Sequence, residues 1–221
     1  MATSDRRAGP CRSRSANVFQ RRTARVRQRS AEAGLANAQV LVSDAASHAF
    51  APAAADLLFS RFGVMVFADP AAAFANLRTA IRPGGRLPFA CWRPIEQNAW
   101  FSVPLAAAGH LLPPSPPAEP DAPGPFAFAD PDRVRRILTT AGWTDFSATR
   151  HDVPIRIAGP GGLQEAAAFA TRVGALARGL SEAEPEVKAR AAQAIAEALR
   201  PFDGPDGITL TGSVWLVSAK N

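Results

Sequence analysis

The chain has 221 residues, 47% of them hydrophobic. This length and composition suit one domain with a buried core and exclude disorder throughout. The formal net charge of +6 is unevenly placed: residues 1–39 hold nine arginines against Asp5 and Glu32, a net +7, whereas the rest of the chain carries −1. The folded part is therefore close to neutral, and no nucleic-acid partner is expected for it.

Cysteine and histidine usage excludes two further classes of protein. Cys11 lies in the polar N-terminal segment and Cys91 at the end of an apolar run, which does not predict a disulfide framework. The three histidines are scattered, so no metal site is expected. No apolar run approaches the roughly 20 residues of a membrane helix, and no signal peptide is evident. We expect a cytoplasmic protein without a membrane partner.

Residues 1–30 are rich in arginine and serine and have almost no apolar periodicity, which predicts a disordered or weakly helical basic tail. A nucleic-acid-binding arm is one alternative, although Phe19 is its single aromatic residue. A mitochondrial targeting peptide is another, although the alanine-, arginine- and proline-rich usage indicates a GC-rich bacterial gene. The interpretation we favour is a truncated or frame-shifted gene start, which sequencing upstream of Met1 would test.

Three short apolar runs predict strands in the region that follows. They are Val40–Val42, Ala55–Phe59 and Gly85–Trp92, the last entered through Arg82-Pro83-Gly84-Gly85. Each run is too short for a stable helix and nearly continuously apolar, which is typical of parallel strands covered on both faces. Between the second and third runs, Asp69-Pro70 predicts a helix start, and an apolar stripe follows at helical spacing: Phe74, Leu77 and Ile81.

The C-terminal half contains further helix and strand signals. Residues 96–125 are rich in proline and predict a loop, with one helical turn around residues 103–110. Asp130-Pro131 repeats the helix-start signal, and Gly142 ends that helix. Phe146–Ile157 predicts a strand, and Ser213–Ala219 predicts a final strand. Between them, residues 159–203 carry two helical patterns, based on Phe169, Val173, Leu176 and Leu180, then Val187, Ala191, Ile195 and Leu199.

This ordered set resembles a class I S-adenosylmethionine-dependent methyltransferase over roughly residues 31–221. The resemblance rests on these segments: Ser43-Asp44-Ala45, Asp56 to Gly63, Arg82 to Leu87, Ile137 to Trp143 and Val214 to Ala219. It implies an α/β fold, an incomplete doubly wound Rossmann-like sheet with a helical cap over about residues 159–203. It also implies that the strands at Phe146–Ile157 and Ser213–Ala219 pair as an antiparallel hairpin. It also implies S-adenosylmethionine as cofactor and methyl transfer to a small-molecule acceptor.

The resemblance implies five cofactor-binding residues at the ends of strands. Asp44 would accept a hydrogen bond from the adenine amino group, and the Ala45 amide would face the ring. Ser60, Arg61 and Phe62 would lie beside the methionine part, where Phe62 offers an aromatic face and Gly63 allows close approach or a positive φ.

Each of these residues also has a purely structural interpretation. The pattern fits a turn aspartate at Asp44 equally well, and it also fits a core side chain at Phe62 and a surface side chain at Arg61. His48 is a candidate general base, though a lone loop histidine is usually just solvated. The catalytic residues stay unknown.

The chain departs from the family pattern in one respect. We expect no Gly-x-Gly after any strand, although the family binds its cofactor with such a turn, and no acidic strand end upstream of Asp44. The first two family strands are then missing. S-adenosylmethionine binding should then be weak or absent. Apolar strand edges at Val40–Val42 and Leu57–Phe59 would be unpaired, and a homodimer could form through them. Pro88 suggests that its own strand lies near an edge.

Two other classes of function remain as alternatives. A nucleotide-sugar or dehydrogenase-type Rossmann enzyme needs the same glycine turn and a catalytic tyrosine, and this chain contains no tyrosine. A non-catalytic relic or interaction module would use the sheet edge or the basic tail to bind a partner. The methyl acceptor cannot be inferred, because the cap and the proline-rich loop offer no interpretable motif.

Overall fold

The computed structural model describes residues 13–16, 20–114 and 122–221, with side chains from residue 24 onward. Its strands and α-helices are, in order, β1 (Ser13–Ala16), α1 (Gln20–Glu32), β2 (Ala38–Leu41), β3 (Ala55–Leu57), β4 (Ser60–Arg61), α2 (Pro70–Thr79), β5 (Ile81–Trp92), α3 (Ala99–Ala108), α4 (Pro131–Thr140), β6 (Thr144–Ala158), α5 (Leu163–Ala170), α6 (Gly174–Gly179), α7 (Pro185–Leu199), β7 (Asp203–Gly204) and β8 (Gly207–Lys220). Short 3-10 helices add η1 (Ile95–Gln97), η2 (Gly109–Leu111) and η3 (Arg200–Phe202).

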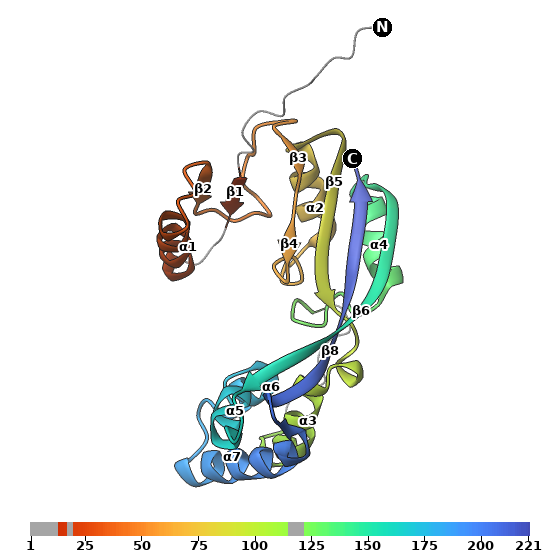
Figure 1. Ribbon diagram of the computed structural model, residues 1–221. Helices are drawn as coiled ribbons and strands as arrows, with labels where there is room; N and C mark the ends of the chain where they lie inside the picture. The colour runs from red at the N-terminus through yellow and green to blue at the C-terminus, as the bar shows by residue number, and fades with distance from the viewer. Residues whose placement is uncertain (1–12, 17–19, 115–121) are drawn as a thin grey trace, which may run out of the picture.

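The main sheet has the strand order β3-β5-β8-β6, and a separate two-stranded parallel sheet pairs β1 with β2. β3 and β4 run parallel to β5, whereas β8 is antiparallel to both β5 and β6. The predicted hairpin between the last two long strands is thereby confirmed. β6 and β8 extend from the sheet into a helical cap built from α3, α5, α6 and α7 (Figure 1).

β5 lies inside the sheet although it contains Pro88. The Leu58 N–H donates to the Arg86 carbonyl at 2.9 Å. The next bond of this parallel ladder would run from the N–H of residue 88 to the Leu58 carbonyl. Proline has no N–H, and the partner strand breaks at this point into β3 and β4. The expected single strand at residues 55–59 is therefore shortened to β3, and β4 follows just beyond it. The expectation of an edge position for Pro88 is wrong.

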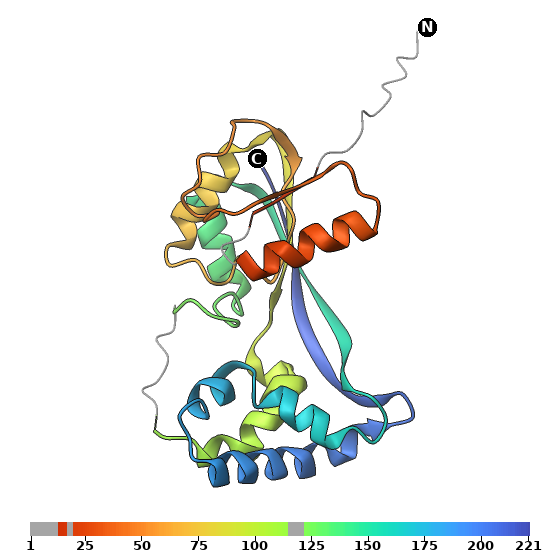
Figure 2. The same cartoon turned by 90° about the vertical axis from the view of Figure 1, so that its left-hand side faces the viewer.

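Two helices begin as the sequence predicted. The Asp69 carboxylate accepts a hydrogen bond from the Ala72 N–H at the start of α2, and Asp130 accepts from two N–H groups at the start of α4. A carboxylate at this position satisfies amides that have no partner within the helix, and the following proline has no N–H to satisfy. Gly142, with φ +85°, ends α4 as expected. Both helices lie against one face of the sheet (Figure 2).

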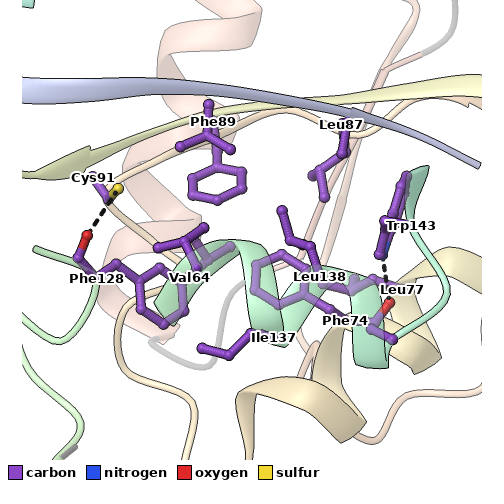
Figure 3. Close-up of a cluster of buried hydrophobic side chains, with 14 of the residues drawn as sticks. Val64, Phe74, Leu77, Leu87, Phe89, Cys91, Phe128, Ile137, Leu138 and Trp143 are labelled. Atoms are coloured by element: carbon purple, nitrogen blue, oxygen red, sulfur yellow. Dashed lines mark hydrogen bonds between the residues drawn. The ribbon is translucent and has the colours of Figure 1, made fainter. Parts of the chain in front are cut away.

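The core of this half lies between that face and the two helices. β5 contributes Leu87, Phe89 and Cys91, and the helices contribute buried apolar side chains opposite them (Figure 3). The Trp143 ring N–H donates to the Phe74 carbonyl at 3.1 Å, which ties the end of α4 to α2. The sheet and its helices thus form one continuous apolar cluster.

The cap differs from its prediction in two places. Residues 171–173 separate α5 from α6, which begins at Gly174 with φ +59°, so the first predicted helix is two helices. The expected loop at residues 96–125 instead begins with η1 and α3, and Pro104 is buried inside α3. One proline removes one hydrogen bond from a helix, and here the proline is buried while its neighbours Val103 and Leu105 pack on the apolar cluster of the cap. The part of this loop at residues 115–121 lies outside the described residues.

The N-terminal segment also differs from its prediction over the residues that are described. β1 pairs in parallel with β2, and residues 20–32 form α1, whereas a disordered or weakly helical tail was expected. Arginine and glutamine favour helices, and Gln28 donates to Glu32 at 2.8 Å on the same helical face. The turn from α1 into β2 contains Gly34 at φ +65°. Residues 1–12 and 17–19, with Cys11 and Phe19, lie outside the described residues.

Candidate functional site

The carboxyl ends of β4 and β5 lie at the same edge of the sheet, because these strands are parallel. Ligands of open α/β sheets bind beyond this kind of edge. Three of the five predicted cofactor residues, Ser60, Arg61 and Phe62, are here, and Trp92 ends the neighbouring strand. In Figure 1 this edge faces the cap.

The turn after β4 is held by local contacts. The Phe62 N–H donates to the Ala90 carbonyl at 3.1 Å, and the Gly63 N–H donates to the Ser60 hydroxyl at 3.2 Å. Phe62 has φ +60°, a left-handed conformation that is rare for a bulky residue. The sequence had suggested this conformation for Gly63 instead. The Phe62 ring stacks on Trp92, with centroids 4.3 Å apart and planes 9° from parallel, and this stacking fixes the strained residue.

Asp44 and Ala45 lie in a second turn, after β2. The Asp44 carboxylate accepts hydrogen bonds from the Ala46 N–H at 2.9 Å and from the Ser47 hydroxyl at 3.3 Å. Asn76 of α2 donates its side-chain amide to the carbonyls of Ala45, at 3.3 Å, and His48, at 3.0 Å. This is the arrangement of a turn aspartate, in a loop anchored to α2.

The two turns pack on the same core, but no described hydrogen bond or ion pair joins them. Ala45 and Phe62 both contact the apolar cluster beneath the sheet. The Ser43 hydroxyl oxygen, next to Asp44, is buried and has no partner within the described residues. A buried hydroxyl without a partner can bind a polar ligand atom. The structure therefore gathers the predicted residues around one core without closing them into one pocket.

Sequence reasoning missed an aromatic ladder that starts at Phe62. Its five partly buried rings are Phe62, Trp92, Trp100, Phe101 and Phe126. The centroid distances are 5.0 Å from Trp92 to Trp100, 5.6 Å from Trp100 to Phe101 and 5.0 Å from Phe101 to Phe126. These separations are typical of stabilising aromatic pairs. The ladder leads from the carboxyl edge of the sheet into the cap.

A polar network lies next to the aromatic ladder, at the junction of sheet and cap. Arg93 is 9% exposed and donates to the Ser213 hydroxyl at 2.8 Å, and that hydroxyl donates to Asp152. Arg150 donates to the same Asp152 carboxylate, and this bond, followed by the one from Ser213, lowers the pKa of Asp152 to about 2. Fully buried Asn98 accepts from the Ser213 N–H at 2.9 Å. These bonds fasten the segment after β5 to β6 and β8.

A glycine-rich turn does follow one strand, so the expectation of none was wrong. β6 ends at Ala158, and Gly159-Pro160-Gly161-Gly162 precedes α5. This turn lies in the cap, at the end of an antiparallel strand. The Gly161 N–H donates to the Asp203 carboxylate at 3.1 Å. This carboxylate therefore already takes a backbone N–H that could otherwise bind an anion. The described ends of β2, β4 and β5 are followed by no Gly-x-Gly.

The described residues give little support to a metal site, a cysteine nucleophile or a membrane-spanning helix. No group of three or more metal-binding side chains occurs within them. Burial raises the pKa of the Cys91 thiol to about 12, so it is not a nucleophile at neutral pH. Among the described helices none is long and apolar enough to span a membrane.

Residues 4–89 match the sequence pattern of a family described as "Methyltransferase domain". The chain has a mixed α/β fold with a methyltransferase-like sheet. The matched range begins inside the segment for which we favoured a gene-start artefact, and that interpretation stays a prediction. A search of curated proteins finds no match.

Solved structures with this methyltransferase-like fold cover most of the chain at low sequence identity. The YcgJ protein of Bacillus subtilis is 11% identical with a TM-score of 0.58, over 95% of this chain and 82% of that one. A protein of Bacillus halodurans C-125 assigned as a methyltransferase is 14% identical, TM-score 0.54, over 94% and 81%. The [4+2]-cyclase SpnF is 17% identical, TM-score 0.52, over 95% and 66%. These similarities show the fold.

Proposed function

We propose that this chain transfers a methyl group from S-adenosylmethionine to a small-molecule acceptor. The observation that carries the proposal is the family match at residues 4–89, which includes all five predicted cofactor residues. The arrangement of Phe62 and Trp92 at the carboxyl edge of parallel strands supports it.

The described residues fit the cofactor in part. Phe62 and Trp92 offer aromatic faces, which attract a cation such as a sulfonium. Asp44 would accept from the adenine amino group with Ala45 beside the ring, and the unpartnered Ser43 hydroxyl is available next to them. Ser60 and Arg61 are the remaining two proposed cofactor contacts. The bound cofactor supplies an electrophilic methyl group, and the chain's part is to hold the acceptor in line with it, which needs no side-chain base.

We expect cofactor binding by this chain to be weak. The described ends of the parallel strands carry no Gly-x-Gly turn, and the Asp44 carboxylate already accepts two hydrogen bonds from its own turn. A ligand must replace these contacts or share them. A dissociation constant in the millimolar range, about −4 kcal/mol of binding free energy, is the expected result.

Titration of the full chain with S-adenosylmethionine and S-adenosylhomocysteine, followed by NMR, tests the proposal. Saturable binding in the millimolar range should be weakened about tenfold by Phe62→Ala, while the exposed control Glu186→Gln on α7 leaves it unchanged. Micromolar affinity would overturn the expectation of weak binding. Binding that Phe62→Ala and Asp44→Ala both leave unchanged would place the cofactor elsewhere and remove the assigned contacts.

A second candidate function is a homodimer or interaction module that uses the β3–β4 edge. β3 is an edge strand of the main sheet, and Leu57 and Phe59 on this edge are 47% and 68% exposed. Exposed apolar edge residues favour pairing with another chain. The short strands broken at Pro88 oppose it, because a long regular edge pairs best.

Size-exclusion chromatography with light scattering distinguishes this candidate. A dimer that Phe59→Lys converts to a monomer, and that Leu216→Lys on β8 leaves intact, would support it; Leu216 is 45% exposed and serves as a matched control. A monomer at all concentrations would exclude the homodimer.

A further inference from the structure

Helix α1 has a basic surface that the proposed function does not use. Five of the nine arginines of residues 1–39 lie within its 13 residues, and Glu32 is the one acidic residue of the helix. Side chains are described for residues 24–32 of α1, and all of these are exposed except half-buried Ser30. In Figure 2 the full length of α1 faces the viewer. The helix is therefore open to a partner along its length.

Four of these arginines share one side of the helix. At 3.6 residues per turn, positions 21, 22, 25 and 29 fall within about 100° of the helix circumference, and these four positions are the arginine stripe. Half-buried Ser30 lies about 140° around the helix from Arg25. The arginine stripe is therefore on the solvent side of α1.

The arginine stripe is not neutralised within the described residues. No described ion pair or side-chain hydrogen bond involves Arg25 or Arg29. The Glu32 carboxylate accepts a hydrogen bond from Gln28 at 2.8 Å instead. Like charges one helical turn apart, as at positions 21, 25 and 29, repel each other and weaken a helix. A bound polyanion would remove this repulsion, so binding should also stabilise α1.

We propose that α1 binds the phosphate backbone of double-stranded nucleic acid through the arginine stripe. A duplex carries one negative charge per about 1.7 Å of its axis, and an arginine can bond two phosphate oxygens at once. Residues 20–49 contain no phenylalanine, tyrosine or tryptophan, so unpaired bases would find no such ring to stack on. Binding should therefore favour duplexes and be independent of their sequence. This inference does not rest on the proposed methyl transfer.

The composition of α1 argues against a lipid surface as the anionic partner. A helix that lies in a membrane interface needs a broad apolar face opposite its charges. Val26 is the one large apolar residue of α1, and the rest of the helix is polar or alanine. A nucleic-acid arm was among the interpretations that the sequence left open for residues 1–30. The described helix supplies that arm with an ordered basic surface.

Fluorescence anisotropy of a labelled DNA duplex of mixed sequence, titrated with the full chain at several salt concentrations, tests the proposal. Four phosphate contacts predict a slope of log K against log salt of about −3.6, which weakens binding roughly 100-fold between 50 and 200 mM salt. The double variant Arg25→Gln/Arg29→Gln should make the slope shallower by about 1.8 and weaken binding about tenfold or more. Arg25→Lys/Arg29→Lys keeps the charge and should keep most of the slope. The matched control Arg172→Gln/Arg190→Gln removes the same charge from exposed positions in the cap and should leave the slope unchanged.

Three results would overturn the proposal: no binding of the duplex at 50 mM salt, binding that is insensitive to salt, or the same loss of affinity in the α1 variant and the cap control. Vesicles rich in phosphatidylserine and polyglutamate are the probes for the other anionic partners. Tighter binding of either one than of the duplex would replace nucleic acid as the partner.

Amide hydrogen exchange of the unsubstituted chain gives a second measurement that needs no variant. The duplex should slow exchange within residues 20–32, because binding removes the repulsion between the arginines of α1. Unchanged exchange in this segment, with the duplex bound, would place the contact elsewhere and reject the arginine stripe. If Arg25→Gln/Arg29→Gln loses α1, as judged by the same exchange, the lysine variant and the unsubstituted chain decide the question.

Discussion

The core beneath the sheet and the core of the cap are filled in different ways. Beneath the sheet, large rings are almost fully buried: Phe74, Phe89, Phe128 and Trp143. In the cap cluster, seven of the thirteen buried residues are alanines, so the helices approach closely and little space remains. The core beneath the sheet needs large side chains to fill it, whereas the core of the cap needs small ones. Truncation of a side chain should therefore damage the first core, and enlargement of a side chain should damage the second.

The helices of the two halves also begin differently. α2 and α4, under the sheet, start at Asp-Pro pairs whose carboxylates bind the first amides. α5, α6 and α7, in the cap, have no side-chain hydrogen bond at their N-caps. The cap helices are thus stabilised more by packing than by their own ends.

The largest expected effect is loss of a ring from the sheet core. Phe74 is 0% exposed, and Phe74→Ala should lower the free energy of unfolding by about 3–5 kcal/mol, since the cavity cannot fully close. Urea denaturation measures this change. Phe169→Ala, which truncates a phenylalanine that is 36% exposed, is the matched control and should lose much less. Equal losses would show that burial does not separate the two positions.

Enlargement of the cap core should have the next largest effect. Ala167 on α5 is 0% exposed, and Ala167→Leu should destabilise by about 1–3 kcal/mol, because the added atoms force neighbouring helices apart. The neighbouring residue Ala168 is exposed, and Ala168→Leu provides the control. Amide hydrogen exchange should show the loss chiefly in α5 and α7. Identical stability of the two variants would contradict close packing in the cap.

A helix start in the cap can be converted to the type found under the sheet. Glu184 precedes Pro185 at the N-cap of α7 with extended backbone angles, φ −61° and ψ 152°. Glu184→Asp should stabilise by about 0.5–1 kcal/mol, because the shorter carboxylate can reach the first free amides. The reverse change Asp130→Glu at α4 should cost a similar amount, and thermal melts measure both. Destabilisation by Glu184→Asp would show that its geometry differs from that of α4.

The smallest expected effect concerns pH at the junction of the two halves. Hydrogen bonds from Arg150 and Ser213 lower the pKa of Asp152 from 3.8 to about 2, with nearby Arg93 adding to the shift. Because the folded-state pKa is below the unfolded one, the stabilisation is present above pH 4 and is lost as pH falls from about 4 to 2. Asp152→Asn should flatten the stability curve in this window. The same slope in both proteins would contradict the assignment.

Much of the fold follows from local signals. Asp69-Pro70 and Asp130-Pro131 predicted helix starts that the structure contains, because a cap acts within a few residues of sequence. The pairing of the final two long strands was implied by the family resemblance, because no local signal joins segments so far apart in sequence. The five proposed cofactor residues lie at strand ends, as the pattern indicated, and their roles stay predictions.

The features that sequence reasoning missed depend on contacts between distant segments. Phe62 adopts a positive φ where Gly63 was expected to, since its conformation depends on stacking with Trp92, 30 positions away. The break between β3 and β4 opposite Pro88 could not be predicted without knowing which strands pair with β5 on each side. The nearest available signal for the ladder was the group of aromatic residues just after a predicted strand, at Trp92, Trp100 and Phe101.

The β6–β8 pair has a consequence for how this protein can be rebuilt. Ala158 and Ile208 are paired, so the chain leaves the sheet strands and returns to them at one point. Residues 159–207 are therefore an insertion within a hairpin. A short turn could join the two long strands, with loss only of the two-residue β7 that pairs with the start of β8. α3 comes from a different part of the chain, and it would then lose the helices that cover it. Any graft of a foreign cap must be designed together with a matching α3.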